Sequence, residues 1–426
     1  MSELVLLKDV QDPNLMTVEE YRQTGGYEAL KKVLLEMKPD QVIEEVKKSG
    51  LRGRGGAGFP TGMKWSFIPK TSDKPKYMVV NSDESEPGTC KDRVIIEKTP
   101  FLLMEGITIS SYAIGSSTCY LYIRGEYYDQ AMILKQAIED AYKHGYLGKN
   151  ILGSGYNLDV YLHRGAGAYI CGEETGLLES LEGKKGWPRL KPPFPATSGL
   201  YGCPTCVNNV ETLGAVVLII QKGGDWYASL GTPKNGGTRL FCVSGHVKKP
   251  GTYELPMGIP LRSIIYDYAG GIKDDRKLKA VIPGGSSVPI LTADEIDVKM
   301  DFDSVAAIGS LLGSGGVVVM NEDTCMVKAL LRISKFYAHE SCGQCTPCRE
   351  GTTWLKKTLQ RVYDGDARPE DLDHLLGIAF NMMGTTICAL SDAAAMPVRS
   401  YIQKFRHEFE YHVQHKCCDV QAAVRV

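Results

Sequence analysis

The sequence lacks any long hydrophobic run. Its longest apolar stretch is about Leu213 to Ile220, whereas a helix that crosses a bilayer needs about 20 apolar residues. The first residues, MSELVLLK, also lack the basic segment and extended apolar core of a secretory signal. We therefore expect no membrane-spanning segment and no signal peptide, and we expect a cytoplasmic protein.

The sequence also lacks a long basic run, an internal repeat and a low-complexity segment. Its formal net charge is −1, so nucleic acid and anionic lipid are not favoured as partners. It has 13 cysteines but no secretory signal, which favours reduced thiols with metal or redox roles over a disulfide scaffold. A length of 426 residues suggests roughly three domains.

Four cysteines carry the most informative pattern. Three of them, Cys342, Cys345 and Cys348, lie in the segment SCGQCTPCR, and Cys388 follows in a separate segment, TICA. Three thiolates at this spacing can occupy three corners of a cuboidal cluster from one short loop, and the fourth can close the remaining corner. This is the ligand number that a [4Fe–4S] cluster needs.

A structural zinc site or unrelated buried thiols are the alternatives. Zinc sites usually take their ligands as two separated pairs, whereas here three cysteines come together and one comes alone, with no histidine between them. The spacing also differs from the bacterial ferredoxin run, because no Cys-Pro pair follows directly. The pattern therefore favours an iron–sulfur cluster, but not a small two-cluster ferredoxin fold.

The first half of the chain alternates between strand-like and helix-like patterns, which predicts an α/β domain with a mainly parallel sheet. Residues 17–49 have a helical pattern. Strands are expected at 77–80, 120–123 and 160–162, and helices at 101–114 and 127–143.

The second half changes in character. Residues 238–322 have short strands and turns around one helix at about 261–268, which indicates a small α+β module. Four amphipathic patterns follow from residue 324 onward and predict a four-helix bundle. The apolar positions are Met326, Leu330, Ile333 and Phe336; Leu355, Leu359 and Val362; Leu372, Leu375, Ala379 and Met383; and Val398, Ile402, Phe405 and Phe409. Both cysteine segments fall between helices, at connections that can lie at the same end of such a bundle.

Two loops of the first domain are candidates for cofactor binding. The glycine loop GRGGAG spans residues 53–58, and small residues allow backbone N–H groups to approach a phosphate. Arg52, Arg54 and Lys64 add positive charge nearby. A helix precedes this loop where a dinucleotide fingerprint requires a strand, so the usual Rossmann context is missing, and a flexible turn is the alternative.

The acidic turn NSDESEPG at residues 81–88 follows the first predicted strand. Carboxylates beyond the carboxyl end of a strand can hydrogen-bond the hydroxyl groups of a ribose or ribityl chain, although a solvated turn is an equal alternative. The segment GAGAYICGEET at residues 165–175 again follows a strand and combines small residues, an aromatic and paired carboxylates. The two loops together favour a redox cofactor.

Five segments together resemble the NADH-binding flavoprotein subunit of respiratory complex I, also called the F subunit or the 51-kDa subunit. They occur in order along nearly the whole chain as LRGRGGAGFPTGMKW, NSDESEPG, AYICGEET, VNNVET and ESCGQCTPCREG. The resemblance implies an FMN- and NADH-binding α/β domain over residues 1–237, a ubiquitin-like (β-grasp) module over 238–322, and a helical bundle with a [4Fe–4S] cluster over 323–426.

The resemblance also implies which residues contact each group. Cofactor contacts are expected at Gly53, Arg54, Gly55, Gly56, Ala57, Gly58, Lys64, Asn81, Asp83, Glu84, Ser85, Tyr169, Gly172, Glu173, Glu174, Asn208 and Asn209. NADH is expected at Phe59, Phe67, Glu86, Glu174 and Phe194, with aromatic rings against the adenine. The cluster is expected on Cys342, Cys345, Cys348 and Cys388. The acidic site fits NADH better than NADPH, because it would repel a 2′-phosphate.

By the same resemblance, the chain accepts hydride from NADH onto FMN and passes single electrons to its cluster. The implied partners are a thioredoxin-like [2Fe–2S] subunit and a larger multi-cluster subunit, in a peripheral arm on the cytoplasmic side of the inner membrane. No catalytic side chain is required, because the cofactor carries the chemistry. The alternative is the diaphorase subunit of a soluble NAD-linked hydrogenase or formate dehydrogenase.

Two further groups of residues lie outside this pattern. Cys203 and Cys206 form a C-x-x-C pair that we interpret as incidental thiols, with a redox or metal role as the alternative. The tail from His412 to Cys418 contains side chains that can bind a metal, and we interpret it as a frayed terminus.

Overall fold

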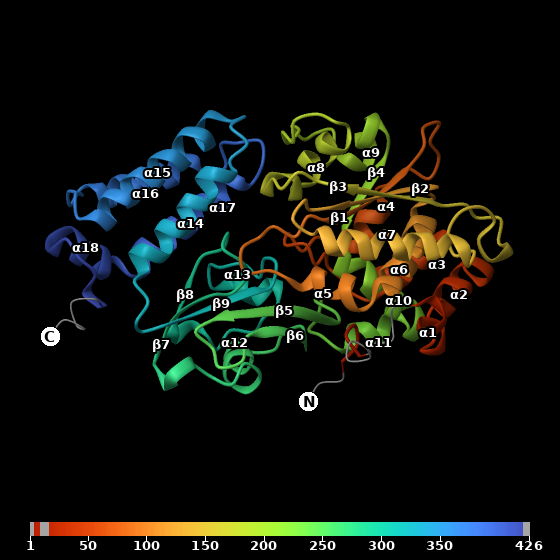
Figure 1. Cartoon of the computed structure of the whole chain (residues 1–426), viewed down its shortest axis with the longest axis horizontal. Coiled ribbons are helices and arrows are strands. Elements are labelled where there is room, and N and C mark those ends of the chain that lie inside the picture. Colours follow the sequence, from red (N-terminus) through yellow and green to blue (C-terminus); the bar gives the residue numbers. More distant parts are fainter. Residues whose placement is uncertain (1–3, 9–16, 421–426) are drawn as a thin grey trace.

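The structure is a computed structural model that describes residues 4–8 and 17–420. Figure 1 shows two sheets and a separate group of helices at the C-terminal end of the chain. No helix in these described ranges is long and apolar enough to cross a membrane.

The first sheet is entirely parallel and has the strand order β3-β2-β1-β4. Its strands are β1 (Tyr77–Ser82), β2 (Thr118–Ile123), β3 (Asp159–Arg164) and β4 (Thr205–Asn209). The first three confirm the predicted strands. Because the strands are parallel, their carboxyl ends meet at one edge of the sheet, which is where ligands bind in open α/β sheets.

Helices pack against this sheet (Figure 1). The apolar core of this part of the chain is formed by buried residues of the strands and of these helices. Helix α6 is buried along almost its whole length and packs closely on α10: a Cβ on Gly106 would lie 2.2 Å from the carbonyl oxygen of Leu213, so glycine is required there. The helices of this region are α1 (Val18–Gln23), α2 (Glu28–Glu36), α3 (Pro39–Lys48), α4 (Thr61–Ser66), α5 (Lys91–Lys98), α6 (Pro100–Ile114), α7 (Tyr128–Lys143), α8 (Glu174–Leu181), α9 (Pro195–Ser198), α10 (Val210–Lys222) and α11 (Gly224–Ser229).

The second sheet is mixed and has the strand order β6-β5-β9-β7-β8. Strands β5 and β9 are parallel and the remaining neighbours are antiparallel. Its elements are β5 (Thr238–Gly245), β6 (Gly251–Pro256), α12 (Leu261–Ser263), β7 (Leu278–Ile282), β8 (Leu291–Thr292), α13 (Phe302–Ala307) and β9 (Gly316–Asn321). The helix expected at about 261–268 is one short α-helical turn that continues as a π-helical turn, Ile264–Tyr268.

The C-terminal helices are α14 (Met326–Glu340), α15 (Thr346–Asp364), α16 (Asp371–Met382), α17 (Leu390–Lys404) and α18 (Arg406–His415). Helices α14 to α17 pack on one another around a shared apolar core. The prediction of one helix through Val398 and Phe409 is wrong, because Phe405 has φ −123° and ψ 29° and separates α17 from α18. A single non-helical residue leaves the apolar spacing almost unchanged, so the periodicity did not reveal the break.

Candidate functional site

The candidate site lies at the carboxyl edge of the parallel sheet. Asn81 lies near the end of β1, and its side-chain amide donates a hydrogen bond of 2.8 Å to the carbonyl oxygen of Gly172. This bond joins the acidic turn after β1 to the loop after β3. The two loops that the sequence marked as candidates are therefore neighbours in space.

The glycine loop lies beside the end of β4. It follows α3 and closes on itself through a hydrogen bond of 2.9 Å from the Gly53 N–H group to the carbonyl oxygen of Phe59. A Cβ on Gly55 would lie 3.3 Å from the Cβ of Asn209, while Gly55 and Ala57 are exposed. The backbone between Gly53 and Gly58 is thus open to a ligand at the sheet edge, as a phosphate cradle requires.

Arg54 does not contribute charge to this cradle, so that part of the prediction is wrong. Its side chain is fully buried, and its guanidinium donates hydrogen bonds of 2.8 and 2.9 Å to the carbonyl oxygens of Gly236 and Thr238. It ties the glycine loop to the start of the second sheet. Arg52 is also engaged, in an ion pair of 3.2 Å with Asp303.

Lys64 is the cation that reaches the candidate site. Its ammonium group lies 2.8 Å from the carbonyl oxygen of Val207 and 3.4 Å from a carboxylate oxygen of Glu174. Lys191, which the sequence analysis missed, pairs with Glu174 at 2.8 Å and with Glu173 at 3.0 Å. Burial opposes ionisation of Glu174, but the neighbouring Lys64 and Lys191 outweigh it and lower the pKa of this carboxyl group.

Glu84 and Glu86 have different surroundings although they are two residues apart. The Glu84 carboxylate is buried and accepts hydrogen bonds of 2.8 Å from the backbone N–H groups of Lys91 and Asp92, so it caps the N-terminus of α5. The Glu86 carboxylate accepts hydrogen bonds from the Tyr169 hydroxyl at 2.5 Å and the Ser287 N–H group at 2.8 Å. Glu86 therefore joins the acidic turn and the loop after β3 to the turn between β7 and β8 of the second sheet.

The contribution of the second sheet was missed in the sequence analysis. Ser286 donates a hydrogen bond of 3.3 Å to Glu86 and lies 2.9 Å from the Tyr337 hydroxyl. The small-residue turn GGSS at 284–287 was the available signal. Nothing in its local pattern indicates that it meets the acidic turn about 200 residues earlier.

Asp83 titrates near neutral pH. Burial raises the pKa of its carboxyl group to about 7, although the Ser85 hydroxyl donates a hydrogen bond to it. The folded-state pKa lies above the unfolded value of about 3.9. The stability contributed by the neutral carboxyl is therefore fully present below the unfolded pKa and is lost as the pH rises through about 7.

We expect Asp83→Asn to raise the melting temperature of the flavin-free chain at about pH 8 and to leave it almost unchanged near pH 4, where the carboxyl group is protonated and resembles the amide. Thermal unfolding followed at both pH values measures the difference. An equal shift at both values would contradict the raised pKa.

The three candidate phenylalanines for NADH are all exposed. Phe59, Phe67 and Phe194 keep 45%, 53% and 57% of their surface accessible, which is high for such apolar side chains. The ring centroids of Phe59 and Phe67 are 6.0 Å apart and the rings are inclined by 50°. Exposed aromatic faces beside a cradle for phosphates are suited to stacking on a base.

We expect Phe59→Ala to weaken NADH binding by about tenfold, because stacking of a base on an aromatic ring contributes about 1–3 kcal/mol, and to leave the FMN content unchanged. Phe380→Ala is the matched control, since Phe380 is an exposed phenylalanine on α16. NADH titration of flavin reduction measures the effect. Equal NADH affinity in the Phe59 variant and the control would show that Phe59 does not stack on the base.

The two cysteine segments meet, as the helix pattern predicted. Cys342 and Cys345 lie between α14 and α15, Cys348 lies in the first turn of α15, and Cys388 lies just before α17. The Ile387 N–H group is 3.5 Å from the sulfur of Cys345, which joins the two segments. Burial raises the pKa of the Cys388 thiol to about 11, so a metal must displace its proton on binding.

The loop after β3 contacts the cysteine segment directly. The Tyr169 N–H group donates a hydrogen bond of 3.0 Å to Glu340 at the end of α14, and the Tyr169 and Phe336 rings are 5.1 Å apart. Trp187 donates a hydrogen bond of 3.1 Å from its indole nitrogen to the carbonyl oxygen of Cys342. The candidate flavin site and the candidate cluster site therefore share a boundary.

Cys203 and Cys206 are both buried. Burial raises the pKa of Cys206, whose sulfur accepts a hydrogen bond of 3.2 Å from the Asn208 amide. A buried thiol of this kind is unreactive, which agrees with the interpretation as incidental thiols.

The chain is similar to known proteins over most of its length. The F 2 subunit of NADH-quinone oxidoreductase in Rhizobium meliloti (strain 1021) is 54% identical over 418 residues, which is 98% of this chain and 99% of that protein. The chain belongs to the family of NADH-quinone oxidoreductase F subunits. The F subunit of Rickettsia bellii (strain OSU 85-389) is 58% identical over 385 residues, 90% of this chain and 92% of that protein.

Family models match three parts of this NADH-quinone oxidoreductase homologue. Residues 46–218 match the Nuo51 FMN-binding domain, residues 239–319 match the SLBB domain, and residues 328–412 match the NADH-ubiquinone oxidoreductase-F iron-sulfur binding region. These matches confirm the predicted FMN and [4Fe–4S] cofactors. The glycine cradle and the converging cysteines fit the two groups.

The fold is shared with a solved structure. The crystal structure of NAD+-reducing [NiFe]-hydrogenase in the H2-reduced state aligns with a TM-score of 0.84 and 36% sequence identity. The alignment covers 96% of this chain and 66% of the hydrogenase chain, so this chain spans slightly less than two thirds of that length.

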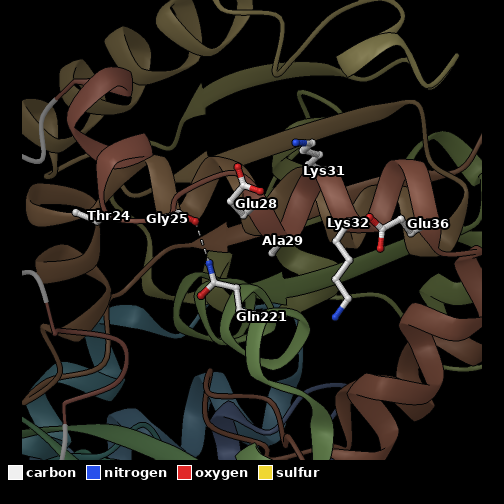
Figure 2. A pocket seen from close by; sticks show the side chains of 8 residues that line it. All are labelled: Thr24, Gly25, Glu28, Ala29, Lys31, Lys32, Glu36 and Gln221. Carbon is white, nitrogen blue, oxygen red and sulfur yellow. Dashed lines mark hydrogen bonds between the residues drawn. The ribbon is translucent and has the colours of Figure 1, made fainter.

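A hollow of about 430 Å³ lies elsewhere on the molecule, between α2 and α10 (Figure 2). It is lined by Thr24, Gly25, Glu28, Ala29, Lys31, Lys32, Glu36 and Gln221. None of these residues belongs to the predicted sites, and the polar ends of Lys32 and Gln221 already bind the carbonyl oxygens of Ile220 and Gly25.

Proposed function

We propose that this chain is the electron-entry subunit of an NADH:quinone oxidoreductase. FMN, when bound, accepts a hydride from NADH and releases electrons one at a time, which suits it to feed an iron–sulfur cluster. The observation that carries the proposal is the direct contact of two segments of the first domain with the cysteine segment. Tyr169, in the loop after β3, binds Glu340, and Trp187, after α8, binds the carbonyl oxygen of Cys342.

The residues of the chain position both partners of the hydride transfer. The backbone of Gly53 to Gly58, together with Lys64, would hold the phosphate of FMN, and polar side chains at the ends of β1 and β4 and in the loop after β3 would hold its ring and ribityl chain. These side chains are Asn81, Asp83, Ser85, Tyr169, Glu173, Asn208 and Asn209, together with the backbone of Gly172. Such positioning lowers the barrier because the two rings meet in a reactive orientation.

NADH would bind on the exposed side of the cradle. Phe59, Phe67 and Phe194 contact the adenine, while Glu86 and Glu174 accept hydrogen bonds from hydroxyl or amide groups of the dinucleotide. The negative charge of these carboxylates disfavours the 2′-phosphate of NADPH. Two observations support this arrangement. The three rings are exposed, and Glu86 lies beside Tyr169.

Cys342, Cys345, Cys348 and Cys388 hold the cluster that receives the electrons. We infer that residues 238–322 are a ubiquitin-like (β-grasp) module. We also infer that the domain expected over 323–426 contains a four-helix bundle, α14 to α17, followed by α18. The mixed sheet and the shared core of these helices support this division.

We infer that the electrons continue to a thioredoxin-like [2Fe–2S] subunit and a larger multi-cluster subunit, in a peripheral arm on the cytoplasmic side of the inner membrane. The alternative is the diaphorase subunit of an NAD-linked hydrogenase, which the shared fold supports. Identities of 54% and 58% to the two NADH-quinone oxidoreductase chains, against 36% to the hydrogenase chain, favour the first proposal.

Purification without air from the native host, with its partners, tests the proposal. We expect about one FMN and about four iron atoms per copy of this chain in addition to the iron of its partners, and co-purification with quinone-reducing subunits. Co-purification with a nickel-containing hydrogenase would support the alternative instead.

A further inference from the structure

Three metal-binding side chains meet at the opposite end of α14 to the cluster cysteines. The ligand atoms of Cys325, His412 and Cys418 all lie within 4.8 Å of one another. Cys325 is the residue before α14, His412 lies on α18, and Cys418 follows α18. The interpretation of this tail as a frayed terminus is wrong for the described residues up to 420, because α18 packs against α14 and α15.

One pair of these atoms has the separation expected for two ligands in a tetrahedral metal site. The sulfur of Cys325 is 3.4 Å from Nε2 of His412. Zinc bonds of about 2.3 Å to sulfur and about 2.0 Å to nitrogen place these two atoms about 3.5 Å apart at a tetrahedral angle. This pair therefore already has the separation that two ligands of one ion would have, and the ligand atom of Cys418 lies within 4.8 Å of both.

The environment of His412 also points to a ligand. Its side chain is 2% exposed. Nε2, the ring nitrogen that faces the Cys325 sulfur, is the atom that would bind an ion shared with this cysteine.

Further contacts hold α18 and Cys325 in place. Glu408, one turn before His412, accepts a hydrogen bond of 3.3 Å from the Met326 N–H group and pairs with Lys279 at 2.9 Å, so α18 is fixed at the start of α14. The sulfur of Cys325 accepts a hydrogen bond of 3.4 Å from the Lys328 N–H group in the first turn of α14.

We propose that Cys325, His412 and Cys418 bind a zinc ion. An oxygen from Asp419 or from water completes the four ligands, and a carboxylate oxygen of Asp419 lies 3.5 Å from the Cys418 sulfur. Binding displaces one proton from each of the two thiols and leaves the imidazole neutral. Zinc is not redox-active in proteins, so the site does not take part in electron transfer. It fastens the C-terminal end of the chain to α14, the helix that leads into the cluster cysteines.

Metal analysis and zinc-edge X-ray absorption on the full-length, cluster-loaded protein test this proposal. We expect about one zinc per chain, with two sulfur neighbours at about 2.3 Å. Cys325→Ser, Cys418→Ser and His412→Asn should each lower the zinc content by at least about tenfold. Cys417→Ser is the matched control beside the site and should retain zinc.

Cys388→Ser separates this site from the cluster site, since it should remove iron and retain zinc. Iron-loaded wild-type protein that contains less than about 0.1 zinc per chain after growth with added zinc would overturn the proposal. Zinc that is lost with Cys388 but kept without Cys418, or a Cys325–Cys418 disulfide found by mass spectrometry of the fresh protein, would also overturn it. If the ligand variants misfold and lose FMN, the number of sulfur neighbours around zinc in the wild-type protein tests the proposal instead. Two sulfur neighbours would support the site, and none would overturn it.

Discussion

Replacing Cys388 by serine is expected to remove the iron–sulfur cluster and leave FMN bound. Cys388 comes from a different connection than the other three cysteines, and the Ile387 N–H group beside it already touches the sulfur of Cys345. Loss of this thiolate opens one corner of the cluster, because a [4Fe–4S] cluster needs all four ligands. The flavin residues lie on other elements, so their cradle is retained.

Iron content and low-temperature EPR of the reduced protein measure this effect. We expect iron to fall from about four atoms per chain to less than about one, while FMN content and flavin reduction by NADH stay at the wild-type level. Cys90→Ser is the control, because Cys90 is an exposed cysteine at the start of α5. An unchanged EPR signal in the Cys388 variant would show that Cys388 is not a ligand.

Glu86→Gln is expected to weaken NADH binding by about tenfold, which corresponds to about 1.4 kcal/mol. The substitution keeps the size of the side chain but removes its charge, and hydrogen bonds to a charged acceptor contribute about 1.5–3 kcal/mol. The amide can still accept one bond from Tyr169 or Ser287, which hold the carboxylate in the wild-type protein. The loops around the site should therefore remain folded.

Stopped-flow reduction of the flavin at increasing NADH concentration measures the change. Glu44→Gln is the control, since Glu44 is an exposed carboxylate on α3 that pairs with Lys47. We expect the preference for NADH over NADPH to decrease in the Glu86 variant, because less charge opposes the 2′-phosphate. The same NADH dependence in both variants would exclude Glu86 from the nucleotide site.

The local patterns of the sequence were sufficient for most elements of the first sheet. Apolar alternation located β1 to β3, and helical spacing located α6 and α7. The absence of a strand before the glycine loop was also evident, because α3 leads into it. These features depend on neighbouring residues along the chain, which is why periodicity reveals them.

Contacts between distant residues could not be predicted in this way. Arg54 lies within the glycine loop, where the sequence suggests an exposed cation. Its side chain is instead buried against carbonyl oxygens of residues more than 180 positions later in the chain. Glu84 and Glu86 look alike in the acidic turn, but one caps α5 and the other meets the turn at Ser287. Only the folded arrangement separates their roles.

The tail from His412 to Cys418 is a second case in which local sequence patterns were not sufficient. His412 and Cys418 were recognised as residues that can bind a metal, but their third partner, Cys325, lies 87 residues before His412. Without it, a local pattern of two ligands does not distinguish a site from a frayed end. His412 lies on α18, which the break at Phe405 separates from α17, and the apolar spacing did not reveal this break.

Reduction of the protein by NADH, followed by EPR of the frozen sample, tests most directly whether the flavin and the cluster act together in this chain. In protein purified without air and free of mediators, NADH should bleach the flavin and produce the signal of a reduced [4Fe–4S] cluster. Electron transfer between the two groups would be contradicted if NADH bleached the flavin but gave no cluster signal while dithionite did, or if the protein contained neither iron nor FMN.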